Sequence, residues 1–176
     1  MKESGTTNPI AVGDIVDYQQ EEGGTGAIIK IHPRRNYIIR KSTNLSRQSH
    51  IIASNLDTAF LVVTLDFPET KTAFIDRFLV TCEAYRVPVK IILNKCDLIS
   101  EEYTGYLEAF KKIYNEAGYE VVEISALTGH NVEIVRNLCK GKISLFSGQS
   151  GVGKSSLINA LDSALTIKTA EISHYH

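Results

Sequence analysis

The chain has 176 residues, of which 43% are hydrophobic and 22% charged, and its formal net charge is −1 at pH 7. This composition is typical of a soluble globular protein, and no apolar run reaches the roughly 20 residues of a membrane-spanning helix. The three widely spaced cysteines include no Cys-x-x-Cys pair. They therefore argue against a disulfide framework or a zinc site and predict a cytoplasmic protein with reduced thiols.

The first part of the chain, residues 8–55, reads as short β-strands. The segments 13–18, 25–31 and 36–41 are β-branched or aromatic and are separated by turn-forming stretches, which predicts part of a small β-barrel. Residues 30–50 carry six basic side chains and no acidic one, which leaves 13 basic and 20 acidic residues elsewhere. Such a basic segment suits a nucleic-acid contact, and a solvated basic face is the alternative.

From residue 56 onward, strands and helices alternate. Apolar strands are predicted at 59–65, 87–94, 119–125 and 142–147, and helices at 72–86, around 106–114, at 132–138 and at 155–165. Repeated strand–helix units predict a parallel sheet covered by helices on both faces, the α/β class. The side chains expected to face inward are Phe74, Ile75, Phe78, Leu79 and Cys82 in the first helix, Tyr106, Leu107, Phe110, Ile113 and Tyr114 in the second, and Leu157, Ile158, Leu161 and Leu165 in the last.

The segment GQSGVGKSS, residues 148–156, has the Gly-x-x-x-x-Gly-Lys-Ser spacing of a phosphate-binding loop. It lies between a predicted strand and a predicted helix, as that motif requires. A glycine-rich turn before an ordinary helix is the alternative. Lys154 would contact the outer phosphates and Ser155 would bind Mg²⁺, so these two are the candidate catalytic residues. The predicted phosphate contacts are Gly148, Gln149, Ser150, Gly151, Val152, Gly153, Lys154, Ser155 and Ser156.

Two further segments end predicted strands and suit a guanine base. In NKCD, residues 94–97, the Asp97 carboxylate can accept hydrogen bonds from N1–H and the 2-amino group of guanine, which adenine does not offer. Asn94 would hold the neighbouring loop, and Lys95 would lay its stem along the base. A strand-terminal turn with a surface ion pair is the alternative. Backbone N–H groups of the second segment would meet the guanine O6 atom; its residues are Ser125, Ala126 and Leu127.

The order of these motifs is the reverse of the usual one, because the phosphate loop follows the base-reading segments. Strand neighbours are fixed by packing and not by chain order, so a chain whose ends lie close together can be rejoined and reopened elsewhere. The sequence therefore predicts a circularly permuted P-loop GTPase domain at 56–176, preceded by a partial β-barrel at 1–55. Only 20 residues follow Ser156, and they contain no Asp-x-x-Gly segment of the kind that hydrolysis needs.

Together, NKCD, SAL and GQSGVGKSSLINAL resemble the circularly permuted, ribosome small-subunit-dependent GTPases, the RsgA or YjeQ/EngC family. The resemblance extends to TNPIAVGD, PRRNYIIR, ASNLDTAFLVV and FIDRFLV. It implies an N-terminal OB-fold that touches 16S ribosomal RNA, a GTPase domain that uses Mg²⁺ with GTP or GDP, and a C-terminal zinc domain. It also implies late maturation of the small (30S) subunit with subunit-stimulated hydrolysis by a cytoplasmic monomer that has no membrane partner.

The chain departs from that family pattern at both ends. Only six residues precede TNPIAVGD, and most switch segments and the Cys/His zinc ligands are absent, so we expect a fragment that binds nucleotide and lacks part of the hydrolytic machinery. The alternatives are a nucleotide-gated RNA-binding module without significant turnover, and a P-loop ATPase. OB-folds bind nucleic acid through charged grooves and stacking side chains. The candidate RNA contacts are Arg34, Arg35, Tyr37, Arg40, Lys41 and Arg47.

Overall fold

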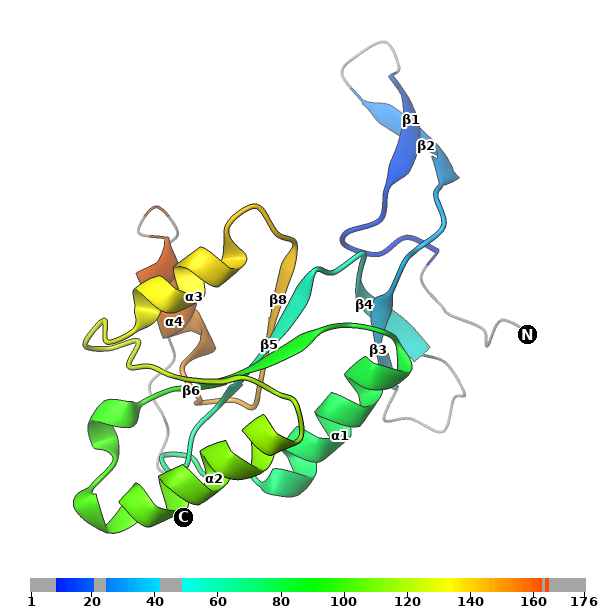
Figure 1. Cartoon of the computed structure of the whole chain (residues 1–176). Helices are drawn as coiled ribbons and strands as arrows, with labels where there is room; N and C mark the ends of the chain where they lie inside the picture. The colour runs from blue at the N-terminus through cyan, green and yellow to red at the C-terminus, as the bar shows by residue number, and fades with distance from the viewer. Residues whose placement is uncertain (1–8, 21–24, 42–48, 163, 165–176) are drawn as a thin grey trace.

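The computed structural model describes residues 9–20, 25–41, 49–162 and 164 (Figure 1). The N-terminal region holds four strands, β1 (Val16–Gln20), β2 (Gly26–Ile31), β3 (Tyr37–Lys41) and β4 (Ser49–Ser54). After them come β5 (Thr58–Val63), α1 (Thr72–Ala84), β6 (Val89–Leu93), the 3₁₀ turns η1 (Cys96–Leu98) and η2 (Glu101–Tyr103), α2 (Thr104–Glu116), β7 (Val121–Glu123), α3 (Val132–Cys139), β8 (Ser144–Ser147) and α4 (Lys154–Leu161).

The N-terminal strands form two antiparallel pairs, β1 with β2 and β3 with β4. An isolated bridge joins Val12 to Ala53. Figure 1 shows the β1–β2 pair extending away from the rest of the molecule and the β3–β4 pair lying beside β5 and α1. The first strand begins at Val16, three residues later than predicted, because Gly13 turns the chain with φ 90°. The prediction named no strand at β4, whose pairing partner is set by tertiary structure.

The second region is a four-stranded sheet in the order β7-β6-β5-β8, with every neighbouring pair parallel. Every residue of β5 is buried, as expected of a strand covered on both faces. The carboxyl ends of β5, β6, β7 and β8 therefore meet at one edge of the sheet, which is where ligands bind in α/β folds.

Helices cover both faces of this sheet, which confirms the predicted α/β architecture (Figure 1). On one face α1 and α2 pack through Ile75, Leu79, Phe110 and Tyr114 on Leu61, Val63, Ile91 and Leu93. On the other face α3 and α4 pack through Val135 and Leu157 on Phe60, Val62 and Ile92. Within the described ranges, no helix has the length and apolar character that crossing a membrane requires.

A third, smaller core joins the two regions. Ile38 of β3 and Ala53 of β4 pack against Leu56, Ala59, Cys82 and Val87 at the other end of the sheet. The rings of Tyr37 and Tyr85 add a contact beside it, with centroids 4.8 Å apart. Strands β3 and β4 are therefore packed against the amino end of β5 and the carboxyl end of α1.

Two helices differ from prediction. In α2 the buried side is formed by Leu107, Phe110 and Tyr114, whereas Tyr106 and Ile113 are 46% and 62% exposed. At 100° per residue, Tyr106 and Ile113 lie on a neighbouring stripe of the helix, so only three of the five predicted side chains reach the sheet. Helix α4 ends at Leu161, because Asp162 is extended with φ −137° and ψ 107°. Leu165 lies outside the described residues.

Candidate nucleotide-binding site

The phosphate loop joins β8 to α4, as the sequence predicted. Gly148 has φ 151° and Gly153, which caps α4, has φ 90°. A Cβ atom added to Gly148 would lie 2.3 Å from the carbonyl oxygen of Val62, and one added to Gly153 would lie 2.4 Å from the side-chain nitrogen of Asn94. The loop backbone thus approaches the ends of β5 and β6 too closely for any side chain at these two positions. Ser150, at the tip of the loop, is exposed.

Lys154 is the first residue of α4, and its ammonium group turns back over the phosphate loop. Nζ donates to the carbonyl oxygens of Gly148 at 2.9 Å and of Gln149 at 2.5 Å. Partial burial lowers the pKa of Lys154 from its ordinary value. The half-buried Ser155 and Ser156 follow in the first turn of the helix. A helix N-terminus and an adjacent ammonium together favour an anionic ligand here.

Asn94 connects the phosphate loop to the second base-reading segment. Its side chain is 3% exposed, and Nδ2 donates to the carbonyl oxygen of Val152 at 2.8 Å. Oδ1 accepts from the backbone N–H of Ala126 at 3.0 Å. Because Val152 also buries its own side chain in the core under α3 and α4, this part of the phosphate loop is held from both sides.

Lys95 makes a second connection from the same segment. It has φ 64°, and its Nζ donates to the carbonyl oxygens of Gly151, at 2.8 Å, and of Phe67, in the turn between β5 and α1. Burial lowers the pKa of Lys95, and Asp97 partly opposes that effect. The ammonium group of Lys95 therefore ties the phosphate loop to the β5–α1 turn, and the position of its stem along a guanine base stays a prediction.

A pocket of 250 Å³ opens beside Lys95, between the β5–α1 turn and the residues that follow β6. It is lined by Leu65, Asp66, Phe67, Asn94, Lys95, Leu98, Ile99, Ser100 and Tyr103. The pocket adjoins the guanine-reading segment on the side of α2, and Asp97 is not among its lining residues.

Asp97 lies in η1 with its side chain exposed. The turn that carries it is held on the neighbouring strand, because the N–H of Cys96 donates to the carbonyl oxygen of Ile124 at 3.1 Å. This contact brings the NKCD segment to the end of β7, where the SAL segment begins. The two base-reading segments therefore meet at the carboxyl edge of the sheet.

The SAL segment forms a tight turn after β7. Ser125 is fully buried, and its Oγ accepts from the N–H of Thr128 at 3.1 Å. Leu127 is 86% exposed. Two of the backbone donors that we assigned to guanine O6 have partners within the chain. The N–H of Ser125 donates to the carbonyl oxygen of His130 at 3.0 Å, and the N–H of Ala126 donates to Asn94, which we expected to hold a neighbouring loop.

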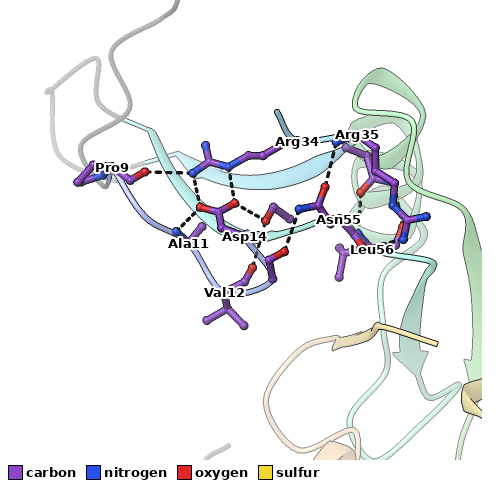
Figure 2. Close-up of polar contacts among 11 residues, drawn as sticks. Pro9, Ala11, Val12, Asp14, Arg34, Arg35, Asn55 and Leu56 are labelled. Atoms are coloured by element: carbon purple, nitrogen blue, oxygen red, sulfur yellow. Dashed lines mark hydrogen bonds and ion pairs between the residues drawn. The ribbon is translucent and has the colours of Figure 1, made fainter. Parts of the chain in front are cut away.

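Two of the basic candidates for RNA contact, Arg34 and Arg35, lie away from this site, in the loop before β3. Figure 2 shows Arg34 in a two-point ion pair with Asp14, with Nε–Oδ1 and Nη2–Oδ2 distances of 2.6 Å. Asp14 also accepts from Ser54 Oγ at 2.6 Å and from the N–H of Ala11 at 2.8 Å. The Arg34 guanidinium is the main cause that holds the pKa of the Asp14 carboxyl well below its ordinary value. This pair joins residues that are 20 apart in the sequence.

Arg35 has a different set of partners. Its Nη2 donates to the carbonyl oxygen of Asn55 at 2.7 Å and to Oδ1 of Asp57 at 2.5 Å (Figure 2 labels Arg35 and Asn55). Asn36, only 7% exposed, bonds through its side chain to both backbone groups of Leu56. The PRRN segment, residues 33–36, thus forms contacts within the chain. No signal in the sequence would have predicted them.

The remaining RNA candidates differ in their surroundings. Tyr37 packs against Tyr85, and Arg40 is exposed on β3. Lys41 ends β3, and Arg47 lies outside the described residues. Among the described residues, Arg40 is exposed and forms no ion pair, unlike Arg34 and Arg35.

The fold and the site define a class of protein. Three motifs for phosphate and guanine meet at one edge of a parallel sheet, and the strand that carries the phosphate loop follows the other three strands of that sheet in the described part of the chain. This is the arrangement of a circularly permuted P-loop GTPase domain.

The chain belongs to the RsgA GTPase family, whose model matches residues 31–176. It is 56% identical over 171 residues to the small ribosomal subunit biogenesis GTPase RsgA of Bacteroides fragilis, covering 97% of this chain and 55% of the relative. It is 52% identical over 174 residues to the protein of the same name from Christiangramia forsetii, again covering 97% of this chain and 55% of the relative.

Solved structures agree with this assignment. The crystal structure of YjeQ from Thermotoga maritima matches with a TM-score of 0.76 and 37% identity, covering 92% of this chain and 54% of that one. The crystal structure of YloQ, described as a circularly permuted GTPase, matches with a TM-score of 0.68 and 34% identity, covering 90% and 52%. The chain therefore spans about half the length of the relatives it matches.

Proposed function

We propose that this chain binds GTP and GDP at the carboxyl edge of its parallel sheet. The observation that carries the proposal is the position of Asn94, which bonds to the phosphate loop at Val152 and to the SAL turn at Ala126. One buried amide thus holds the phosphate-binding and base-reading elements together. A site built this way has its parts in place before the nucleotide arrives, which lowers the cost of binding.

Three of the predicted residues then have specific roles. The Asp97 carboxylate selects guanine by accepting from its N1–H and 2-amino groups. Lys154 and the N-terminus of α4 bind the phosphates. The Ser155 hydroxyl, in the first turn of α4, suits a Mg²⁺ ion, whose chemistry is to neutralise charge on the phosphate oxygens. These assignments rest on motif position and on the fit of the glycine-lined loop.

We further propose that the protein hydrolyses GTP and acts in maturation of the small ribosomal subunit in the cytoplasm, as a monomer. The names of its relatives and its family membership support GTP hydrolysis and a role in biogenesis of the small subunit. The N-terminal strands would contact ribosomal RNA, with exposed Arg40 and with Lys41 and Arg47 as the basic contacts and Tyr37 beside them.

Equilibrium titration with GDP and ADP is the first test. We expect GDP to bind at least a hundredfold more tightly than ADP. A site built to hydrogen-bond the N1–H and 2-amino groups of guanine is left unpaired by adenine, which lacks both groups. Equal affinities would refute the guanine assignment and favour a P-loop ATPase.

GTP turnover with and without small ribosomal subunits is the second test. A rise of tenfold or more, about 1.4 kcal/mol off the barrier, supports a subunit-stimulated enzyme. Tight GDP binding without such a rise would instead favour a nucleotide-gated binding module.

A further inference from the structure

The carboxylate of Asp57 lies between the N-terminal region and the strand that carries the phosphate loop. Oδ1 is 2.5 Å from Nη2 of Arg35, and Oδ2 accepts from the N–H of Ile143 at 2.8 Å. The backbone N–H of Asp57 also donates to the carbonyl oxygen of Ile143 at 2.9 Å. Ile143 is the residue directly before β8. Asp57 therefore fixes the point at which the chain enters that strand.

Strand β8 transmits this position directly to the phosphate loop. It has four residues, and Gly148 follows its last residue, Ser147. Its described pairing is with β5 alone, at one edge of the sheet. A short strand held on one side depends more on its end contacts than a central strand does. A shift at Ile143 would therefore reach Gly148, where a Cβ atom would already be too close to Val62.

Arg35 connects Asp57 to the N-terminal region through Asn55. The backbone N–H of Arg35 donates to Asn55 Oδ1 at 3.0 Å, and Nη2 donates to the Asn55 carbonyl oxygen at 2.7 Å. Asn55 Nδ2 in turn donates to the carbonyl oxygen of Gly13 at 2.8 Å. Polar contacts thus run without a break from the residues before β1 to the entry of β8.

We infer that Arg35 and Asp57 are positioning residues for the phosphate loop and that they couple the N-terminal region to nucleotide affinity. The inference rests on the proposed function of that loop in binding nucleotide. The pair is too exposed to serve mainly as a stabiliser, with side chains 54% and 31% exposed, since ion pairs of this kind contribute little to folding. It places an acid and a guanidinium where the polar network of Asn55 meets Ile143, the residue before β8.

Arg34 provides a matched control, because it is the same residue type one position earlier with different partners. Its ion pair with Asp14 is more buried, with side chains 18% and 1% exposed, and it bonds only within the N-terminal region among the described residues. Arg34→Lys keeps the charge and loses the two-point geometry. This variant should lower the melting temperature and leave nucleotide affinity unchanged.

The experiment measures GDP affinity and melting temperature of the protein expressed from its intact gene, at a temperature where every variant is folded. We expect Arg35→Gln and Asp57→Asn each to weaken GDP binding by about threefold to tenfold with little change in melting temperature. The double variant should bind GDP no more weakly than whichever single variant has the lower affinity, because substitutions that break one shared contact do not have additive effects. Amide hydrogen exchange over residues 143–150, measured without nucleotide, should be faster in both single variants and unchanged in Arg34→Lys.

Two results would overturn the inference. One is wild-type GDP affinity and exchange in Arg35→Gln and Asp57→Asn. The other is an equal loss of affinity in Arg34→Lys, which would mean that general destabilisation is responsible. Failure of the proposed function looks different, because the wild-type protein itself would then bind no nucleotide while the exchange measurement would still report on the position of β8.

Discussion

Replacing Asn94 with alanine should separate the three parts of the nucleotide site. The substitution removes the hydrogen bonds to Val152 and Ala126. The Val152 carbonyl is buried and loses its partner, which costs about 1–3 kcal/mol, and the half-buried Ala126 N–H adds about 1 kcal/mol. We therefore expect the free energy of unfolding to fall by about 2–4 kcal/mol. For a urea m-value of about 2 kcal/mol per M, the unfolding midpoint would fall by about 1–2 M.

The larger effect should be on nucleotide binding. Without Asn94, the phosphate loop and the SAL turn are no longer held in one arrangement, so binding must also supply the cost of ordering them. We expect GDP affinity to fall at least tenfold, about 1.4 kcal/mol. Fluorescence titration with a labelled GDP measures this affinity, and urea unfolding without nucleotide measures the stability.

A stability-matched control makes the result interpretable. Leu79→Ala empties a buried position on α1, against the opposite face of the sheet from α4, and should cost about 2–5 kcal/mol. This variant should keep its GDP affinity under conditions where it is folded. Our account of Asn94 is refuted if Asn94→Ala binds GDP within twofold of wild type, or if Leu79→Ala loses as much affinity.

Three further predictions concern the nucleotide site and the ion pair of Asp14. Asp97→Asn leaves the exposed η1 turn folded but offers guanine one good acceptor in place of two. GDP affinity, measured by titration with labelled GDP, should fall tenfold to a hundredfold, about 1.5–3 kcal/mol for a charged hydrogen bond. Gly148→Ala places a Cβ atom 2.3 Å from the Val62 carbonyl oxygen, so the loop must move and GDP binding should be largely lost. Because Arg34 holds the pKa of Asp14 below its ordinary value, the ionised carboxylate stabilises the fold above about pH 4, and that contribution is lost as pH falls through the lowered pKa. Asp14→Asn should therefore be less stable than wild type at pH 7 and should lose less of its stability between pH 5 and pH 2, as measured by thermal unfolding.

Each of these predictions has a control or a contrary result. Gly118→Ala also changes a glycine at positive φ, 91°, but its Cβ atom would meet nothing within 4 Å, so nucleotide binding should survive. Unchanged GDP affinity in Asp97→Asn would show that this carboxylate does not read the base. Parallel stability curves for wild type and Asp14→Asn below pH 5 would show that the Asp14 ion pair is not linked to folding.

The motifs of the site were predictable because their function depends on local spacing. The spacing of Gly148 to Ser156 predicted a loop between a strand and a helix, and the structure has that loop between β8 and α4. NKCD and SAL each follow an apolar strand. Parallel strands bring their carboxyl ends to one edge, so the meeting of the three motifs followed from the order of elements. We expected Asn94 to hold the neighbouring loop, but its two hydrogen bonds, to Val152 and to Ala126, did not follow from the sequence. They depend on how closely the ends of β6, β7 and β8 approach one another.

The basic segment shows what sequence could not provide. Six cations without an acid between residues 30 and 50 favoured a nucleic-acid surface, and that prediction still applies to Arg40. However, Arg34 and Arg35 have their acidic partners 20 and 22 residues away, at Asp14 and Asp57. A charge pattern along the chain cannot distinguish a solvent-facing arginine from one paired across the fold.

The amino-acid sequence by itself determined the class of this protein, because strand–helix alternation, a glycine-rich loop and two strand-terminal motifs are all local features whose order records the permutation. Only the tertiary structure decided which side of α2 faces the sheet, where α4 ends and which partners the PRRN residues take. The physical reason is distance along the chain. Hydrogen bonds between neighbours leave a pattern in the sequence, whereas a contact between residues 57 and 143 depends on the packing of every element between them.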